Sequence, residues 1–246
     1  MSKLERAIGD LVIANRILAN EGVVDAYGHV SIRHPMDPQR YLLSCSRSPE
    51  LVDRRDIMEF GLDGVPGGGD DRTPYLERFI HGAIYEARPD IHAVVHSHAD
   101  EVLPFSITTA RLRPVVHTAS CIGERIPLWD IRDKFGDTKL LVTNMAQGRD
   151  LTRRLGSDSV VLMRGHGFAA AGRSLIEVVR ISVYMPRNAR VFMQARQLGR
   201  VKALSRGEIE LRATTRPDAP ESLRAWEYWA IRAGCGDMLA KRSPAR

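Results

Sequence analysis

The sequence is poor in cysteine, in aromatic residues and in long apolar runs, and each shortage excludes a class of protein. Its 246 residues include only three cysteines, Cys45, Cys121 and Cys235. These cannot all pair with one another and form no Cys-x-x-Cys motif, so we expect a reducing, cytoplasmic location. No apolar stretch approaches the ~20 residues that span a bilayer, and no apolar segment follows a basic start. We therefore expect neither secretion nor membrane insertion.

Signatures of nucleic-acid binding are also missing, although the formal net charge is +6. The sequence has no basic strand interleaved with aromatic residues, no zinc-finger spacing and no helix-turn-helix pattern. A basic surface that attracts anionic substrates explains the charge equally well. We therefore expect a small-molecule partner and no nucleic acid.

What is present suffices for one α/β domain over residues 1–246. Hydrophobic residues make up 43% of the chain, which is enough for one large core. The glycine-rich stretch 64–71 is too short to separate domains. Hydrophobic periodicity predicts helices over 4–19, 100–105, 144–155 and 174–199, and strands over 30–32, 41–44, 58–60, 93–96 and 159–163.

Two histidines, His96 and His98, follow the apolar run 93–95. Alternate side chains of a strand share one face, so both imidazoles leave the strand together. Because neutral imidazole is the commonest ligand for divalent metal ions, the pair forms half of a metal site. The alternative is a pair of strand-end histidines without a ligand. The metal hypothesis therefore requires a third ligand and a catalytic acid or base.

A third histidine, His166, follows the predicted strand 159–163 and stands between Gly165 and Gly167. Glycines on both sides let the backbone turn sharply and approach another element closely. The rival interpretation is a nucleotide-binding loop that continues to Gly172. That fingerprint is incomplete, because its third glycine is displaced and no acidic residue follows a second strand. The pattern favours a metal ligand.

A glutamate upstream of the histidine pair, Glu77, is a candidate acid or base. Residues 74–87 have helical periodicity, with Pro74 suited to the first turn and Leu76 on the apolar stripe. A proline at position 89 ends this helix, so the strand with the histidine pair follows directly and brings Glu77 close to it. The alternative is a first-turn glutamate favoured by the helix dipole.

Taken in order, these motifs resemble the class II aldolase/adducin family. The segment Gly28-His29-Val30-Ser31-Ile32-Arg33 is similar to the family's Gly-Asn-Val-Ser-Val-Arg turn. The resemblance implies a three-layer α/β fold whose central, mostly antiparallel sheet is flanked by helices. It also implies a homotetramer with interfacial active sites and one divalent ion per subunit, held by His96, His98 and His166 beside Glu77. Zinc and manganese are the favoured ions, and magnesium, iron and cobalt are also compatible with three imidazoles.

Departures from the family pattern indicate a carboxylated substrate. Sugar-phosphate aldolases of the family hold phosphate with small polar groups, where this chain has His29, Ser46, Arg47 and Tyr75. The loss of hydroxyls argues against a bound phosphate, whereas Arg47 offers a planar fork that pairs with a carboxylate. We expect these four residues to bind the substrate. A solvated Arg47 and a turn-capping His29 are the alternatives.

This combination resembles the branch of the family that decarboxylates hydroxylated aromatic or pyridine dicarboxylates. It implies a metal-dependent carboxy-lyase whose substrate chelates the ion through its ring oxygen and its carboxylate. Glu77 is the first candidate proton donor and requires surroundings that raise its pKa. His117, near the place where the aldolases carry a tyrosine contributed across the subunit boundary, is the second. The alternative for His117 is a strand histidine bonded to backbone.

Three points stay open at this level. Residues 201–246 form a tail that, in this family, lies at an interface or covers an active site, although its aromatic residues favour core packing. His34, His81 and His92 have no motif support and are interpreted as structural or surface residues. The alternative functions are a class II aldolase acting on a non-phosphorylated or sugar-derived substrate and an adducin-like binding module, and the presence of Glu77 with three histidines counts against the latter.

Overall fold

A seven-stranded sheet forms the centre of the computed structural model, which describes residues 2–213 and 219–239. The strand order is β3-β2-β1-β4-β7-β6-β5. Every neighbouring pair is antiparallel except β5 and β6, which run parallel. The sheet therefore agrees with the predicted, mostly antiparallel arrangement. Its strands are β1 His29–Arg33, β2 Arg40–Ser44, β3 Ile57–Gly61, β4 Ala93–Ser97, β5 Leu128–Trp129, β6 Val160–Met163 and β7 Gly167–Gly172.

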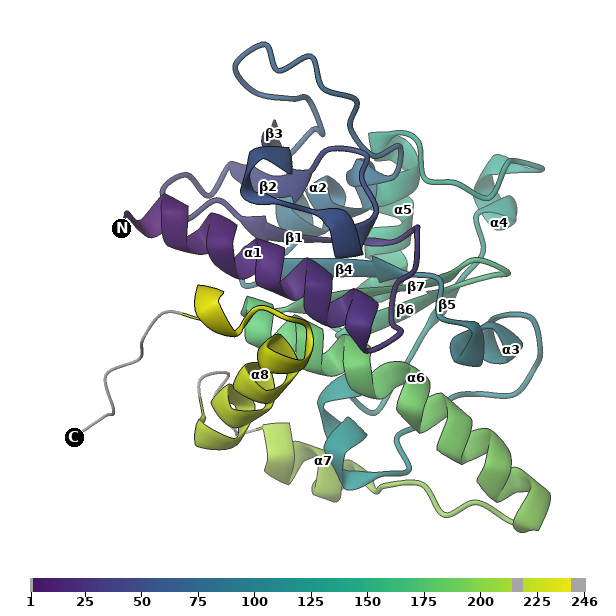
Figure 1. The fold of residues 1–246 in the computed structure, drawn as a ribbon. Coiled ribbons are helices and arrows are strands. Elements are labelled where there is room, and N and C mark those ends of the chain that lie inside the picture. Colours follow the sequence, from purple (N-terminus) through teal and green to yellow (C-terminus); the bar gives the residue numbers. More distant parts are fainter. Residues whose placement is uncertain (1, 214–218, 240–246) are drawn as a thin grey trace.

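Helices cover both faces of the sheet (Figure 1). On the face toward the viewer lie α1, α6 and α8, and α2 and α5 lie behind the sheet. The α-helices are α1 Lys3–Asn20, α2 Arg78–Ala87, α3 Leu103–Ser106, α4 Arg132–Phe135, α5 Met145–Leu155, α6 Leu175–Leu198, α7 Arg206–Ala213 and α8 Pro220–Arg232. Short 3-10 helices span Pro49–Leu51, Arg54–Asp56, Asp100–Val102, His117–Ile122 and Gly236–Met238.

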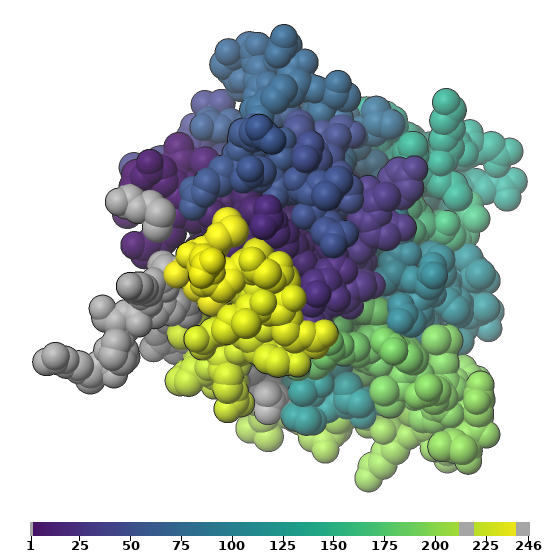
Figure 2. All heavy atoms as spheres, in the orientation of Figure 1, coloured from purple at the N-terminus to yellow at the C-terminus, as the bar shows by residue number. Residues whose placement is uncertain are grey.

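The face toward α1 and α6 is an apolar core. Helix α1 begins at a capping box, in which the Ser2 hydroxyl accepts from the Glu5 amide and the Glu5 carboxylate accepts from the Ser2 amide. Figure 2 shows α8, in yellow, covering part of α1. The α8 side chains Trp226 and Trp229 are each only 3% exposed and belong to this core. These two aromatic side chains of the C-terminal tail therefore pack in the core, and residues 214–218 and 240–246 lie outside the described residues.

The other face carries polar groups at its centre. Side chains alternate along a strand, so Val30 and Ile32 of β1 belong to the core under α1 and α6. The intervening His29, Ser31 and Arg33 face α2, where their side chains contact residues of that helix. This alternation brings polar groups to the side on which His96 of β4 lies.

One predicted element differs from the structure, and one rejected alternative can be compared with it. The helix expected over 74–87 begins at Arg78, because Pro74 is held in an isolated β-bridge with Cys45. Leu76 therefore lies before the helix and is 63% exposed instead of belonging to an apolar stripe. The stretch Gly167–Gly172 is the central strand β7, paired with β4 and β6. A nucleotide-binding loop is thus ruled out there, because its backbone is committed to the sheet.

Two expectations drawn from absences can be compared with the structure. Cys45, Cys121 and Cys235 are all free thiols. Within residues 2–213 and 219–239, no helix has the length and apolar character needed to cross a membrane. The cytoplasmic location stays a prediction.

Candidate metal centre

Four side chains from three parts of the chain converge at one end of the polar face. His96 is the next-to-last residue of β4, His98 directly follows that strand, His166 lies in the turn between β6 and β7, and Glu77 immediately precedes α2. The Nε2 atom of His98 lies 2.9 Å from that of His96 and 3.0 Å from that of His166. Glu77 Oε2 lies 3.2 Å from His96 Nε2 and 3.3 Å from His166 Nε2. All four ligand atoms lie within 4.8 Å of one another, an arrangement that can hold a metal ion.

Close packing of two strands brings His166 to the histidine pair. Gly167 has a φ of 148°, and a Cβ atom built there would lie 2.0 Å from the carbonyl oxygen of Ser97. Any side chain at this position would therefore push β7 away from β4. This is the close approach that the glycines around His166 predict.

Backbone carbonyls fix the orientation of two of the imidazoles. His96 Nδ1 donates to the Phe168 carbonyl at 3.1 Å, and His166 Nδ1 donates to the Leu140 carbonyl at 2.8 Å. In the neutral ring, a proton on Nδ1 leaves a lone pair on Nε2. Both lone pairs point into the cluster. A carbonyl acceptor behind a ligating histidine is the usual outer shell of a metal site.

The donor set fits a divalent cation. Neutral His96 and His166 present lone pairs to His98 Nε2, which carries at most one proton and can satisfy only one of them. The Glu77 carboxylate adds a further acceptor at the same place. Such a concentration of lone pairs in a buried site is unfavourable unless a cation balances it. Three imidazoles and a carboxylate are ligands suited to zinc and related ions.

Glu77 is held as an ionised carboxylate. Its Oε1 accepts a hydrogen bond of 2.9 Å from the Val142 amide, and its side chain is almost fully buried. Burial raises the pKa of Glu77, but His96 and His166 outweigh burial and place that pKa well below its ordinary value. The role predicted for Glu77, a proton donor, requires surroundings that raise its pKa, and these surroundings lower it. The geometry suits a proton acceptor instead.

The imidazoles of the cluster differ in their electrostatics. Burial, followed by the neighbouring His96 and His166, lowers the pKa of His98 to about 3. Burial also lowers the pKa of His166, but the Glu77 carboxylate outweighs burial and raises that pKa above its ordinary value. His98 is therefore neutral at physiological pH and free to act as a ligand.

Of the predicted substrate residues, His29 and Tyr75 lie beside the cluster. The ring of His29 lies 5.2 Å from that of His96 and 4.6 Å from that of Tyr75, measured between centroids. The Tyr75 hydroxyl donates to the carbonyl of Arg47 and also contacts Ser44. These contacts connect the cluster with the segment that follows β2.

Ser46 and Arg47 lie in that exposed segment. The Arg47 Nε donates to the Leu51 carbonyl at 2.6 Å and lies 3.2 Å from Asp56 Oδ2. Its two terminal nitrogens form no hydrogen bond with any described residue. The guanidinium of Arg47 is thus held through Nε, and its two terminal nitrogens are available to a ligand.

His117 is not brought to the cluster within one chain. It starts the 3-10 helix His117–Ile122 instead of standing in a strand, and its side chain is exposed. It lines a different pocket, together with Arg180 and Tyr184 of α6 and Arg224 and Tyr228 of α8.

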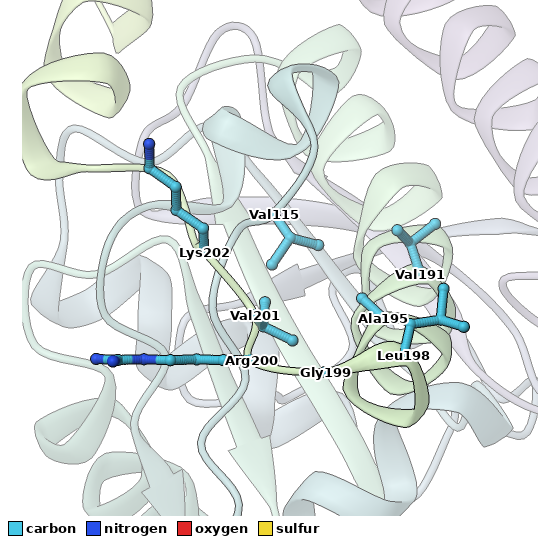
Figure 3. Close-up of a pocket in the computed structure, with 8 residues that line it drawn as sticks. All are labelled: Val115, Val191, Ala195, Leu198, Gly199, Arg200, Val201 and Lys202. Carbon is cyan, nitrogen blue, oxygen red and sulfur yellow. The ribbon is translucent and has the colours of Figure 1, made fainter.

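A further hollow lies at the C-terminal end of α6 (Figure 3). Val115 and Val201 face its interior, whereas Arg200 and Lys202 extend away from these apolar side chains. Its lining has no histidine, cysteine or carboxylate. It therefore offers no alternative metal site.

Sequence reasoning missed one buried residue of this region, His81. It is fully buried and hydrogen-bonds to His29, so it is not a surface residue. A signal was available in the spacing of Glu77, His81 and Tyr85, because residues four apart share one helix face. The backbone groups of Leu140 and Val142 were not detectable, since only the folded loop places them.

Comparison with known proteins identifies the family to which this fold belongs. The model of the family named Class II Aldolase and Adducin N-terminal domain matches residues 9–193, and the chain belongs to that family. A solved L-fuculose 1-phosphate aldolase from Glaciozyma antarctica PI12 shares the fold. Its TM-score is 0.75 at 21% identity, over 94% of this chain and 91% of the aldolase.

Curated relatives cover nearly the same length of chain. Decarboxylase tropJ from Talaromyces stipitatus is 33% identical, over 90% of this chain and 92% of its own. A 3,4-dihydroxyphthalate decarboxylase from Terrabacter sp. is 27% identical, over 90% of this chain and 94% of its own. The decarboxylase names and the class II aldolase fold agree with the prediction of a carbon–carbon lyase.

Proposed function

We propose that this chain is a divalent-metal-dependent decarboxylase of a hydroxylated aromatic or pyridine (di)carboxylate. The observation that carries the proposal is the convergence of three imidazoles and the Glu77 carboxylate within 4.8 Å, in a chain whose relatives are named decarboxylases. The exposed Arg47 and the neighbouring Tyr75 support a carboxylated, planar substrate over a sugar phosphate.

One divalent ion per subunit, zinc or manganese, would be held by His96, His98 and His166. When bound, the ion supplies Lewis-acid stabilisation of the negative charge that develops as a carbon–carbon bond breaks. The Phe168 and Leu140 carbonyls fix two of the rings and thereby aim their lone pairs at the site.

Glu77 moves the proton in this proposal. Because its carboxylate is ionised and held by the Val142 amide, Oε2 accepts the proton of the substrate's ring hydroxyl. The same atom then delivers that proton to the ring carbon that bears the carboxylate. Carbon dioxide leaves, and the electron pair of the broken bond stays in the ring. A positioned acid–base group of this kind contributes roughly a hundredfold or more to the rate.

Four residues around the site would bind the substrate. Arg47 directs the open edge of its guanidinium toward a carboxylate, and Ser46 offers a hydroxyl in the same exposed segment. Tyr75 lines the space between Arg47 and His29. The planar rings of Tyr75 and His29 suit contact with a flat substrate.

His117 takes part in this proposal only through a second copy of the chain. We propose a homotetramer in which His117 and the tail 201–246 of one subunit lie at the site of a neighbour. This arrangement explains how an exposed histidine in a separate pocket contributes a second acid. The mass of the assembly in solution tests the proposal, and a monomer would exclude a role for His117 in the reaction.

Metal analysis combined with a substrate screen tests the proposed function. The purified enzyme is expected to hold one ion per chain and to release carbon dioxide from hydroxylated aromatic or pyridine dicarboxylates, with 3,4-dihydroxyphthalate as the first compound. Release of an aldehyde without carbon dioxide would identify an aldolase instead. Absence of both a stoichiometric ion and turnover would identify a binding module.

A further inference from the structure

A chain of buried hydrogen bonds extends from His29 to Tyr85, between β1 and α2. His29 Nδ1 lies 2.6 Å from His81 Nε2, and His81 Nδ1 lies 2.6 Å from the Ser31 hydroxyl. That hydroxyl lies 2.8 Å from the hydroxyl of Tyr85. All four side chains are at most 3% exposed. Bulk water therefore cannot supply a hydrogen-bond partner that this network lacks.

Two directions of donation are conceivable along such a chain. In one, Tyr85 donates to Ser31, Ser31 to His81 and His81 Nε2 to His29 Nδ1. In the other, every donor and acceptor is exchanged, and His29 Nδ1 donates to His81. The two directions place the proton of a neutral His29 on different ring nitrogens.

Tyr85 selects between these directions. Its hydroxyl has the Ser31 hydroxyl as its hydrogen-bonding side chain and the Val94 backbone as a further partner. The Val94 contact lowers the pKa of Tyr85, so it is a hydrogen bond from an amide donor and offers no acceptor for the phenolic proton. In the second direction Ser31 donates to Tyr85, and the phenolic proton is then left without an acceptor in a buried site. A buried donor that is left without an acceptor is strongly disfavoured. In the first direction every donor of the chain has an acceptor.

We propose that Tyr85, Ser31 and His81 form a one-directional relay that holds His29 with its proton on Nε2, so that His29 donates a hydrogen bond to the substrate beside the metal site. The three relay members are positioning residues, and His29 is the group that touches the substrate. The identification of its acceptor as the substrate carboxylate rests on the proposed function. The assignment of the proton to Nε2 does not.

The location of His29 supports this role. Its ring lies against both His96 and Tyr75, between the metal ligands and the substrate residues. No hydrogen bond joins its Nε2 to a described residue. That atom is also not one of the fully buried polar atoms without a partner. That atom is therefore open to a ligand. Burial lowers the pKa of both His29 and His81 and keeps the relay neutral.

Nitrogen NMR of the metal-loaded enzyme, labelled with ¹⁵N-histidine, measures the position of the proton directly. The wild type is expected to show His29 protonated at Nε2, with its signals assigned by their loss in His29→Phe. A proton on Nδ1 of His29 in the wild type would overturn the proposal. This measurement requires no turnover, so its result is independent of whether the proposed reaction occurs.

Tyr85→Phe removes the group that sets the direction and leaves His29 and His81 in place. We expect the two tautomers of His29 to become mixed. Tyr41→Phe is the matched control, because Tyr41 is an equally buried neighbour of Tyr85 whose hydroxyl donates to the Arg78 carbonyl outside the relay. A purely structural role for the Tyr85 hydroxyl predicts an unchanged His29 tautomer in both variants and would also overturn the proposal.

Binding of two probes tests the substrate contact. Catechol and 2,3-dihydroxybenzoate share two ring hydroxyls, and only the second carries a carboxylate. His29→Phe is expected to weaken 2,3-dihydroxybenzoate binding by about tenfold, and Tyr85→Phe by about threefold, with catechol binding unchanged. Equal weakening of both probes would exclude a hydrogen bond to the carboxylate. Failure of the proposed function appears separately, as a wild type that binds 2,3-dihydroxybenzoate but releases no carbon dioxide from any compound of the screen.

Discussion

The two faces of the sheet are built from the same strands but serve different ends. Toward α1 and α6, β1 presents Val30 and Ile32, which join a core of aliphatic and aromatic side chains. Toward α2, the same strand presents His29 and Ser31, which join a buried polar network beside the candidate metal ligand His96. A one-residue shift along β1 thus separates the part that stabilises the fold from the part that carries the chemistry.

The polar face shows how the fold accommodates a buried polar site. The polar face has an apolar layer of its own, which includes Val94, Val161 and Leu151. Its polar groups satisfy one another within that layer instead of reaching water. Substitutions on the two faces should therefore have separable effects on stability and on metal-dependent activity.

His98→Ala is expected to have the largest effect, confined to the polar face. Because the ion would stabilise the transition state by several kcal/mol, loss of one ligand should remove the ion and lower kcat/KM about a thousandfold. Metal content and the rate of carbon dioxide release are measured on the same preparation. Full activity in a metal-free variant would refute the site.

Ile17→Ala tests the opposite face. Ile17 is fully buried in the core under α1, so truncation should cost about 2–5 kcal/mol of unfolding free energy. Urea unfolding measures this cost, and the metal content of the folded variant should equal that of the wild type. A drop in metal content would show that the two faces are coupled.

The pH dependence of stability should originate on the polar face. Burial, followed by the electrostatic interaction with the neighbouring His96 ring, lowers the pKa of His81 from 6.5 to about 3. Between these values the unfolded chain binds a proton that the folded chain does not, so stability falls as pH decreases from 6.5. One such group contributes up to about 1.4 kcal/mol per pH unit.

His81→Gln removes this titration, so the variant should lose less stability between pH 6.5 and 4 than the wild type does. The comparison uses the slope of the unfolding free energy against pH, since the substitution also changes packing. Identical slopes would show that His81 does not titrate on unfolding.

Arg47→Ala is expected to have the smallest effect, a rise of about threefold to tenfold in KM for a carboxylated substrate. The substitution also removes the contacts of Arg47 with Leu51 and Asp56, so urea unfolding of the variant measures any loss of stability separately. Arg40→Ala is a matched control, since Arg40 lies on β2 and pairs with Glu59 at 3.2 Å. An unchanged KM would remove the argument for carboxylate binding by Arg47.

Helices with a regular apolar repeat were predictable from the sequence. Strands that form only because they pair with neighbouring strands were not. The predicted helix over 144–155 corresponds to α5, because its apolar positions repeat at helical spacing. Strand β7, Gly-Phe-Ala-Ala-Ala-Gly, carries little strand propensity of its own. Its small residues instead fit between β4 and β6. Tertiary pairing, which no local pattern encodes, determines that strand.

The same distinction applies to the site. The shared face of His96 and His98 was predictable because strand geometry is a local property. The place of His166 beside them was implied by the family resemblance, since no local pattern joins residues so far apart in the chain. His81 has no local signature of importance when read alone, and its role depends on which strand α2 covers. The role of His117 depends on a second copy of the chain, so its own sequence neighbourhood does not define it.

One short loop governs two of the four site residues. Leu140, whose φ of 62° is the sole positive value outside glycine among residues 2–213 and 219–239, aims His166 through its carbonyl, and Val142 holds Glu77 through its amide. The proposed ligand His166 and the proposed proton carrier Glu77 therefore share one structural support. A distant substitution that moves this loop should alter metal affinity and proton transfer together.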